Sequence, residues 1–188
     1  KGHEKTQDYG KRKLFFSDKE VVLKSIKYKN KFLSKDLKLN IIKEESKSKI
    51  SKKLIINNIS INSKSITKND VFFAIKGKRL DGNRYIPEAF KKRTSLAIVN
   101  RINKNYPLSK QVKVQNTLDF LTKCSSILRD NINAKIISIT GSCGKTTLKE
   151  MIGITLKEIS RTTYSPKSFN NKFGVPLSLF NLKQDDDF

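Results

Sequence analysis

The sequence lacks the features that mark several classes of protein. Its two cysteines, Cys124 and Cys143, have no paired spacing, which argues against a disulfide framework or a zinc site. No apolar run approaches the length of a membrane span, and the first residues are polar and charged, unlike a signal peptide. We therefore expect a cytoplasmic protein. Because the sequence begins with Lys1 and closes on Asp-Asp-Asp-Phe, we also expect it to be part of a longer polypeptide.

Arginine is scarce although the chain is strongly basic. The formal net charge is +23, yet only 7 of the 40 basic residues are arginines, and the lysines are spread along the chain. Recognition of base edges favours the planar donor pair of Arg, so this charge is more typical of a Lys-rich solvated surface. We expect no nucleic-acid partner and no membrane partner. A basic nucleic-acid-binding module remains the alternative, and a phosphate-bearing substrate is compatible with the charge.

Strand and helix patterns alternate from residue 54 onward. Continuous apolar runs or short alternations predict strands, whereas apolar residues at helical spacing predict helices. The strands are expected at 54–56, 59–61, 71–75, 96–99, 112–114 and 136–139. The helices are expected after Ser17 or Asp18, after Ser34, from Pro87, after Thr117 as capping residue, and over 148–159. This order predicts an α/β fold with a partly parallel sheet.

A short glycine-containing loop connects the last predicted strand to the last predicted helix. The backbone N–H groups of such a loop, together with the helix dipole, can bind the phosphates of ATP. Lys145 would reach the β- and γ-phosphates, and the Thr146 hydroxyl would ligate Mg²⁺. Ile139 stands where the full consensus has glycine, so an ordinary strand-to-helix turn is the alternative. The nucleotide-binding residues are expected to be Thr140, Gly141, Ser142, Cys143, Gly144, Lys145, Thr146 and Thr147.

Several segments, in the same order along the chain, resemble the Mur ligase family. They are the loop just described, the segment 168–177, and the upstream segments 61–64, 70–77 and 81–89. The resemblance covers about residues 32–188. It implies a linker and first helix at 28–53, a small α/β UDP-sugar-binding domain at 54–115, and at 116–188 the start of a P-loop ATPase domain with a mainly parallel sheet.

The resemblance implies an ATP-dependent, ADP-forming acid–amino-acid ligase of peptidoglycan precursor synthesis. ATP would phosphorylate the terminal carboxylate of UDP-N-acetylmuramoyl-tripeptide, and the amine of D-Ala-D-Ala would attack the acyl phosphate. Lys145 and Thr146 would be catalytic, with ATP and Mg²⁺ as cofactors. The residues expected to bind substrate are Ser63, Lys64, Asn170 and Asn171. A folylpolyglutamate-type ligase shares the loop chemistry and is the alternative.

Two positions depart from the family pattern. Lys64 stands where the family usually has Arg, which keeps the charge and loses the bidentate fork. Lys172 stands where an acidic residue is usual. The side chains of Asn170 and Asn171 could equally form the turn that precedes Gly174.

Residues 1–27 resemble the C-terminal end of another member of the same family, the ligase that adds the third residue of the stem peptide. Lys1-Gly2-His3-Glu4 and the segment 13–18 carry this likeness. Glu4 would contact the incoming amino acid when that is a diamino acid, although a solvated surface acid is the alternative. We therefore expect the tail of one ligase fused to the beginning of the next. The 188 residues alone are expected not to form the amide bond, because the rest of the ATPase domain would lie beyond Phe188.

Overall fold

The computed structural model of the protein describes residues 6–8, 13–15, 37–51, 53–77, 80–166, 169 and 171–188. The chain divides into two units, Lys1–Lys35 and Asp36–Phe188. In the first unit, β1 (Thr6–Asp8) pairs antiparallel with β2 (Lys13–Phe15). The sequence pattern had not indicated these strands. The predicted helix after Ser17 or Asp18, and the capping residue Ser34, lie outside the described residues.

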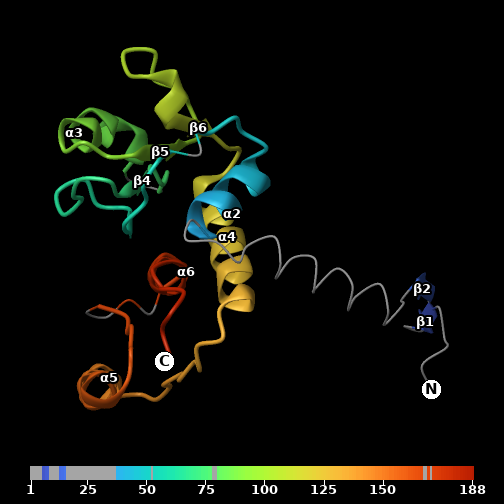
Figure 1. The fold of residues 1–188 in the computed structure, drawn as a ribbon, viewed down its shortest axis with the longest axis vertical. Coiled ribbons are helices and arrows are strands. Elements are labelled where there is room, and N and C mark those ends of the chain that lie inside the picture. Colours follow the sequence, from blue (N-terminus) through green and yellow to red (C-terminus); the bar gives the residue numbers. More distant parts are fainter. Residues whose placement is uncertain are drawn as a thin grey trace. The chain divides into compact units, whose positions relative to one another are not determined.

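A four-stranded parallel sheet lies at the centre of the second unit (Figure 1). Its spatial order is the chain order, and its strands are β3 (Ile59–Ser60), β4 (Val71–Phe73), β5 (Leu96–Val99) and β6 (Gln111–Lys113). Phe72 lies opposite Ala97, and Ile98 opposite Val112. Every residue of β4 and β5 is buried, as their continuous apolar runs predict for strands covered on both faces. The α/β class with parallel pairing is confirmed.

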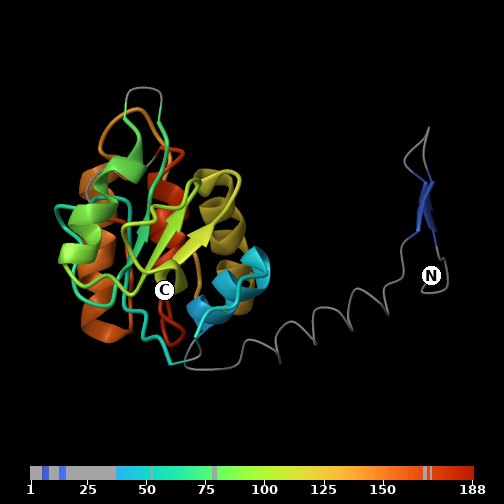
Figure 2. The ribbon, with the colours of Figure 1, turned by 90° about the horizontal axis from the view of Figure 1, so that it is seen from above.

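Helices cover the two faces of the sheet (Figure 2). The short η1 (Gly82–Tyr85) leads into α3 (Ile86–Lys91), whose Ile86 and Ala89 pack with Phe72 in one core cluster. On the other face, Phe73 contacts the rings of Phe120 and Phe180. The helices of the second unit are α2 (Leu37–Ser46), α3, α4 (Thr117–Asn131), α5 (Lys145–Ile159) and α6 (Gly174–Phe180), with η2 (Leu108–Lys110) before β6.

None of the helices in the described ranges has the length and apolar character needed to span a bilayer.

α4 packs against both α2 and α6, and Ser125 of α4 donates a hydrogen bond to the carbonyl of Pro176 at 2.7 Å. Leu37, Ile41 and Ile42 of α2 are buried, as the predicted helical spacing implies.

Two of the predicted strands are wrong. Residues 54–56 are irregular, and the side chain of Ile55 is 63% exposed while its carbonyl accepts a hydrogen bond from Ser95 Oγ. Residues 136–139 also form no strand, and Ile136 and Ile137 are 41% and 50% exposed. A strand needs a neighbour for its backbone N–H and C=O groups. Within 53–77 and 80–166, no strand pairs with either segment.

The capping residue of α4 also differs from the prediction. Asn116 is the N-cap, because its side chain accepts hydrogen bonds from the backbone N–H groups of Leu118 and Asp119 at 2.9 and 3.3 Å. The neighbouring Thr117 hydroxyl instead donates to the carbonyl of Ala74 at 3.1 Å, which ties α4 to the end of β4.

A side-chain amide pairs with the backbone of β3, the strand at one side of the sheet. Asn181 Oδ1 accepts a hydrogen bond from the backbone N–H of Ile59 at 2.8 Å, and Asn181 Nδ2 donates to the Ile59 carbonyl at 3.1 Å. Asn181 therefore pairs with β3 as the backbone of a further strand would. The same Nδ2 donates to the Leu177 carbonyl at 3.0 Å, so the amide also fixes the end of α6.

We predict that Asn181→Ala lowers the free energy of unfolding by about 1–3 kcal/mol, because the Ile59 N–H and C=O lose their partner in a partly buried place. Urea denaturation followed by circular dichroism measures this. Asn105→Ala, at an exposed asparagine, is the matched control and should stay within about 0.5 kcal/mol of the parent. Equal effects of the two substitutions would contradict the role of Asn181.

Candidate functional site

The predicted phosphate-binding loop is sharply turned and open to solvent. Gly141 and Gly144 have φ values of 148° and 75°, both in the region that disfavours residues with a side chain. Residues 140–144 are all exposed. A Cβ at Gly144 would meet nothing within 4 Å, so glycine is needed there for its backbone conformation. The loop is therefore neither extended nor turned into the interior.

The loop ends at the N-terminus of α5, a helix of 15 residues. Its N-cap residue is Gly144, which offers no side chain to bind the first-turn N–H groups, and no acidic residue lies in the first turn. The first-turn N–H groups and the positive end of the helix dipole therefore face the loop without a competing anion from that turn. This arrangement suits a phosphate group.

The ammonium group of Lys145 lies over this loop. It donates hydrogen bonds to the carbonyls of Gly141 and Ser142, the latter at 3.2 Å. Thr146 and Thr147 follow in the first turn of α5 and are exposed. The Thr146 hydroxyl is the hard oxygen ligand that Mg²⁺ prefers. Cys143 is an exposed free thiol in the loop. The eight predicted loop residues thus lie together as one continuous structure.

The chain after α5 returns along that helix. Gly153 is the buried residue of α5, and a Cβ built on it would lie 2.5 Å from Cδ1 of Tyr164. Lys149 and Lys157, one helical turn to either side, have their ammonium groups 5.9 and 4.6 Å from the centre of the Tyr164 ring. Lys149 also donates to the Ser165 carbonyl at 2.6 Å. The only sequence signal for this packing was a glycine inside a helical pattern.

Asn171 forms the turn that begins α6. Its Oδ1 accepts hydrogen bonds from the N–H groups of Phe173 and Gly174 at 3.1 and 2.9 Å, so the turn-forming alternative describes what this side chain does. The Lys172 ammonium lies 5.1 Å from the centre of the neighbouring Phe173 ring, which gives this unusual lysine a favourable contact. Two other predicted site residues, Asn170 and Glu4, lie outside the described residues.

Ser63 and Lys64 lie in the loop that follows β3. The Ser63 side chain is buried, and its hydroxyl donates to Glu88 Oε2 of α3 at 2.6 Å. Lys92 Nζ donates to the backbone carbonyls of Ser63, at 2.9 Å, and of Lys64. Ser63 therefore supports the loop from inside, and Lys64 is the exposed member of the pair.

A polar cluster that the sequence analysis missed lies where β4 and β5 end. Asn83 Nδ2 donates to Asp81 Oδ1 and to Asn100 Oδ1, both at 2.6 Å, and Arg101 pairs with Asp81 at 3.2 Å. The hydrogen bonds from Asn83 hold the pKa of Asp81 below its usual value, with a smaller contribution from Arg101. Asn83 Oδ1 is buried without a hydrogen-bond partner. Parallel sheets bind ligands at this carboxyl edge, and Asp-Gly-Asn after a buried strand was the available signal.

Gly82 brings this cluster back to the end of β4. Its N–H donates to the Ile75 carbonyl at 2.9 Å, and a Cβ on Gly82 would lie 2.6 Å from the Ile75 nitrogen. Only glycine fits so close to the neighbouring backbone.

Two family models match the chain. The Mur ligase family, catalytic domain, matches residues 55–125, and the Mur ligase middle domain matches residues 139–188. Similar curated proteins are the UDP-N-acetylmuramoyl-tripeptide–D-alanyl-D-alanine ligases of Buchnera aphidicola subsp. Baizongia pistaciae and of Rickettsia prowazekii. The Buchnera aphidicola ligase is 37% identical, over 69% of this chain and 28% of the relative. The Rickettsia prowazekii ligase is 34% identical, over 74% of this chain and 31% of the relative. The chain thus spans less than a third of the length of these two relatives.

Solved structures of the same kind share the fold. The UDP-N-acetylmuramoylalanyl-D-glutamyl-2,6-diaminopimelate–D-alanyl-D-alanyl ligase of Acinetobacter baumannii has a TM-score of 0.65 and 29% identity, over 78% of this chain and 34% of that one. The MurF ligase of Thermotoga maritima in complex with ADP has a TM-score of 0.56 and 32% identity, over 73% and 32%.

Packing of Tyr164 over Gly153 yields a test with a definite sign. Gly→Ala inside a helix ordinarily stabilises by about 1 kcal/mol. Here we predict that Gly153→Ala destabilises, because the overlap with the Tyr164 ring costs about 1–3 kcal/mol. In a Tyr164→Ala background the overlap is gone, and the same substitution should stabilise. Urea denaturation of the four proteins measures both effects, and an unchanged sign would contradict the packing.

Proposed function

Because the chain belongs to the Mur ligase family, we propose that it supplies the ATP-binding loop and the UDP-sugar-binding domain of a ligase that joins D-Ala-D-Ala to UDP-N-acetylmuramoyl-tripeptide. The polypeptide that carries these parts would be an ATP-dependent ligase of peptidoglycan precursor synthesis. These two substrates are the ones that give the ligases of Buchnera aphidicola and Rickettsia prowazekii their names.

One observation supports the nucleotide site above all others. Two glycines with positive φ lead into the uncapped N-terminus of α5, and the Lys145 ammonium lies over the loop they form. A nucleotide's phosphates bring several negative charges, which this group of N–H donors and one cation would neutralise. The exposed loop leaves room for them.

The residues of the loop would have distinct parts in the reaction. A carboxylate is a poor electrophile, so it must first be phosphorylated before an amine can displace phosphate from it. Lys145 would hold the terminal phosphate and reduce its charge while the bond to the carboxylate forms. Thr146 would hold Mg²⁺, which when bound neutralises the phosphates further and orients them.

We assign the UDP-sugar end of the substrate to the carboxyl edge of the sheet. Lys64 and Arg101 offer cations near the ends of β3 and β5, and Asn83 Oδ1 is a buried acceptor without a partner. A buried unpaired oxygen is costly unless a ligand donates to it. We also propose that Asn170 and Asn171 bind substrate. In Asn171 the Nδ2 group would make the contact, because Oδ1 accepts the two hydrogen bonds of the turn.

We further propose that the complete reaction belongs to a polypeptide of the relatives' length and that the 188 residues bind ATP without forming the amide bond. α5 exposes Leu148, Met151 and Ile154, at 48–61% of their surface, which supports a further layer of structure over the loop region. We likewise propose that residues 1–27 are the C-terminal end of another ligase of the family and that the chain is fused to further ligase domains at both ends. We propose a linker and first helix at 28–53, the UDP-sugar-binding domain at 54–115, the start of the ATPase domain at 116–188, and a cytoplasmic location.

We predict that the chain binds ATP and that Lys145→Ala weakens this binding at least tenfold, because the cation over the loop is lost. Isothermal titration calorimetry with Mg²⁺ present measures the affinity. Gly144→Val should be as harmful, since a β-branched residue opposes φ near 75°. Lys104→Ala removes an exposed lysine elsewhere and should leave the affinity unchanged. Unchanged ATP affinity in both Lys145→Ala and Gly144→Val would contradict the proposed nucleotide site.

A second titration separates the candidate substrates. We expect the chain to bind UDP-N-acetylmuramoyl-tripeptide in preference to a folate, and Asn83→Leu to weaken the former at least tenfold by removing the buried acceptor. Preference for the folate would favour the folylpolyglutamate-type alternative. Incubation of the purified chain with ATP, UDP-N-acetylmuramoyl-tripeptide and D-Ala-D-Ala should give no pentapeptide product by mass spectrometry, and a product would contradict that part of the proposal.

A further inference from the structure

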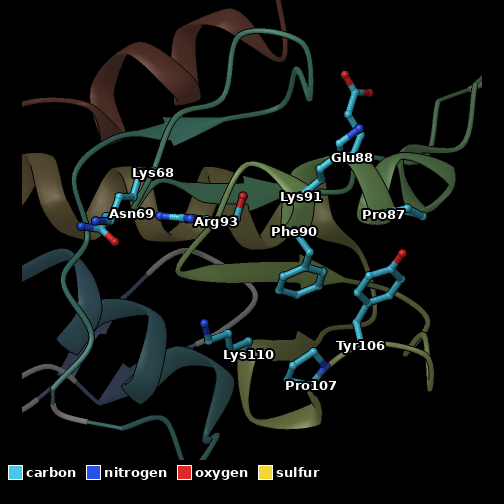
Figure 3. A pocket seen from close by; sticks show the side chains of 11 residues that line it. Lys68, Asn69, Pro87, Glu88, Phe90, Lys91, Arg93, Tyr106, Pro107 and Lys110 are labelled. Carbon is cyan, nitrogen blue, oxygen red and sulfur yellow. The ribbon is translucent and has the colours of Figure 1, made fainter.

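A groove of about 940 Å³ lies along α3 at the amino edge of the sheet (Figure 3). Residues just before β4, just before β5, and before β6 line it together with α3. The candidate substrate cluster lies at the ends of the same strands, so the groove belongs to the opposite edge. Its volume is within the range of sites for small ligands.

Four cations surround this groove. Lys68 precedes β4, Lys91 ends α3, Arg93 precedes β5, and Lys110 precedes β6, and all four are exposed. Among the ion pairs of the described residues, none involves these four side chains. Cations from separate segments that converge without carboxylate partners create a positive potential that attracts anions.

The acid in the lining does not neutralise these cations. Glu88 is turned toward the loop after β3, where its carboxylate accepts the short hydrogen bond from Ser63 Oγ at 2.6 Å. In Figure 3 its carboxylate points away from the rings of Phe90 and Tyr106. The four cations therefore outnumber the one acid of the lining, and that acid is engaged with Ser63.

Two aromatic rings of the lining, Phe90 and Tyr106, stack on one another, and we call this pair the Phe90–Tyr106 platform. Phe90 and Tyr106 stack with their centroids 5.2 Å apart and their planes 11° apart, and both pack partly buried against the core cluster on the α3 face. Figure 3 shows them side by side above Pro107 and Lys110. A rigid aromatic surface beside cations is the combination by which proteins stack bases and hold their phosphates.

Arg93 is kept in this place at a cost in backbone energy. Its φ is 60°, the left-handed conformation that follows a helix and usually belongs to glycine. The conformation is fixed, because Arg93 N–H donates to the Phe90 carbonyl at 2.9 Å and the Arg93 carbonyl accepts from Asn69 N–H at 3.2 Å. Strained residues of this kind are found at functional sites more often than elsewhere.

We propose that this groove binds nucleotide units, with the phosphates on Lys68, Arg93 and Lys110 and a base against the Phe90–Tyr106 platform. Such binding is tolerant of sequence, so the scarcity of arginine, which argues against reading of base edges, does not oppose it. The ligand is a free nucleotide or a short single strand, which share this chemistry. The proposal is independent of the ligase function, since it uses neither the phosphate loop nor the carboxyl edge.

The test measures binding of a labelled twelve-residue oligothymidylate by fluorescence anisotropy, with Lys145→Ala as the parent so that the phosphate loop does not contribute. Lys68→Ser/Lys110→Ser should weaken binding about tenfold and lower the slope of log K against log salt by about 1.4, as expected for two lost phosphate contacts on a single strand. Lys49→Ser/Lys104→Ser has the same net charge and alters exposed lysines outside the groove, so it should change neither. Equal losses in the two double variants would overturn the proposal.

Two further measurements keep the test clear of folding effects. Arg93→Gly relieves the left-handed strain and should raise the midpoint of urea denaturation while it weakens oligonucleotide binding severalfold, and an unchanged affinity would count against the site. An abasic strand with the same number of phosphates should bind the parent about tenfold more weakly than oligothymidylate. Equal affinity would overturn the role of the rings. If thymidine monophosphate competes with the oligonucleotide, the ligand is a free nucleotide. If it does not compete while the oligonucleotide still binds, the ligand is a single strand.

Discussion

The architecture depends on burying a parallel sheet on both faces. In β4, Phe72 and Phe73 point to opposite sides, and each is almost fully buried. Phe72 is covered by α3, which follows at once in the chain, but Phe73 is covered by α4 and by Phe180 from α6, more than one hundred residues later. The chain must therefore return to the sheet after α5. That return fixes the turn at Asn171 and joins residues matched by the two family models in one unit.

Because of this constraint, the phosphate loop lies in the part of the chain that connects α4 and α6, two helices that are fixed to the sheet. α4 is held by Thr117 on the Ala74 carbonyl, and α6 by Ser125 on the Pro176 carbonyl and Asn181 on β3. Between these points, residues 136–144 are largely exposed, and α5 has Tyr164 over Gly153 on its buried side. The loop keeps its shape from local causes, namely its glycines and the helix that follows, and these need no distant partner.

The same distinction explains what the sequence could and could not predict. The apolar runs of β4 and β5, the proline at the start of α3 and the helical spacing of α5 are local, and those predictions are confirmed. The strand expected at 136–139 depends on a neighbouring strand, which periodicity cannot supply. Asn181 and Ser63 contact residues 122 and 25 positions away, so no pattern in one sequence could have revealed their roles. Asn116 rather than Thr117 is the N-cap of α4, because the Thr117 hydroxyl donates its hydrogen bond to the Ala74 carbonyl.

Glycine shows why the loop is easier to recognise than the packing around it. Gly141 and Gly144 are required by backbone conformation, with φ of 148° and 75°, and a Cβ at Gly144 would meet no atom. Gly82, Gly153 and Gly174 have no such φ, and glycine is required there because a Cβ would come within 2.5–2.7 Å of another segment. The first requirement is set by a few consecutive residues and appears as a motif. The second is set by the close approach of another part of the chain, Ile75, Tyr164 or Phe169, and this approach becomes visible only when the chain is folded.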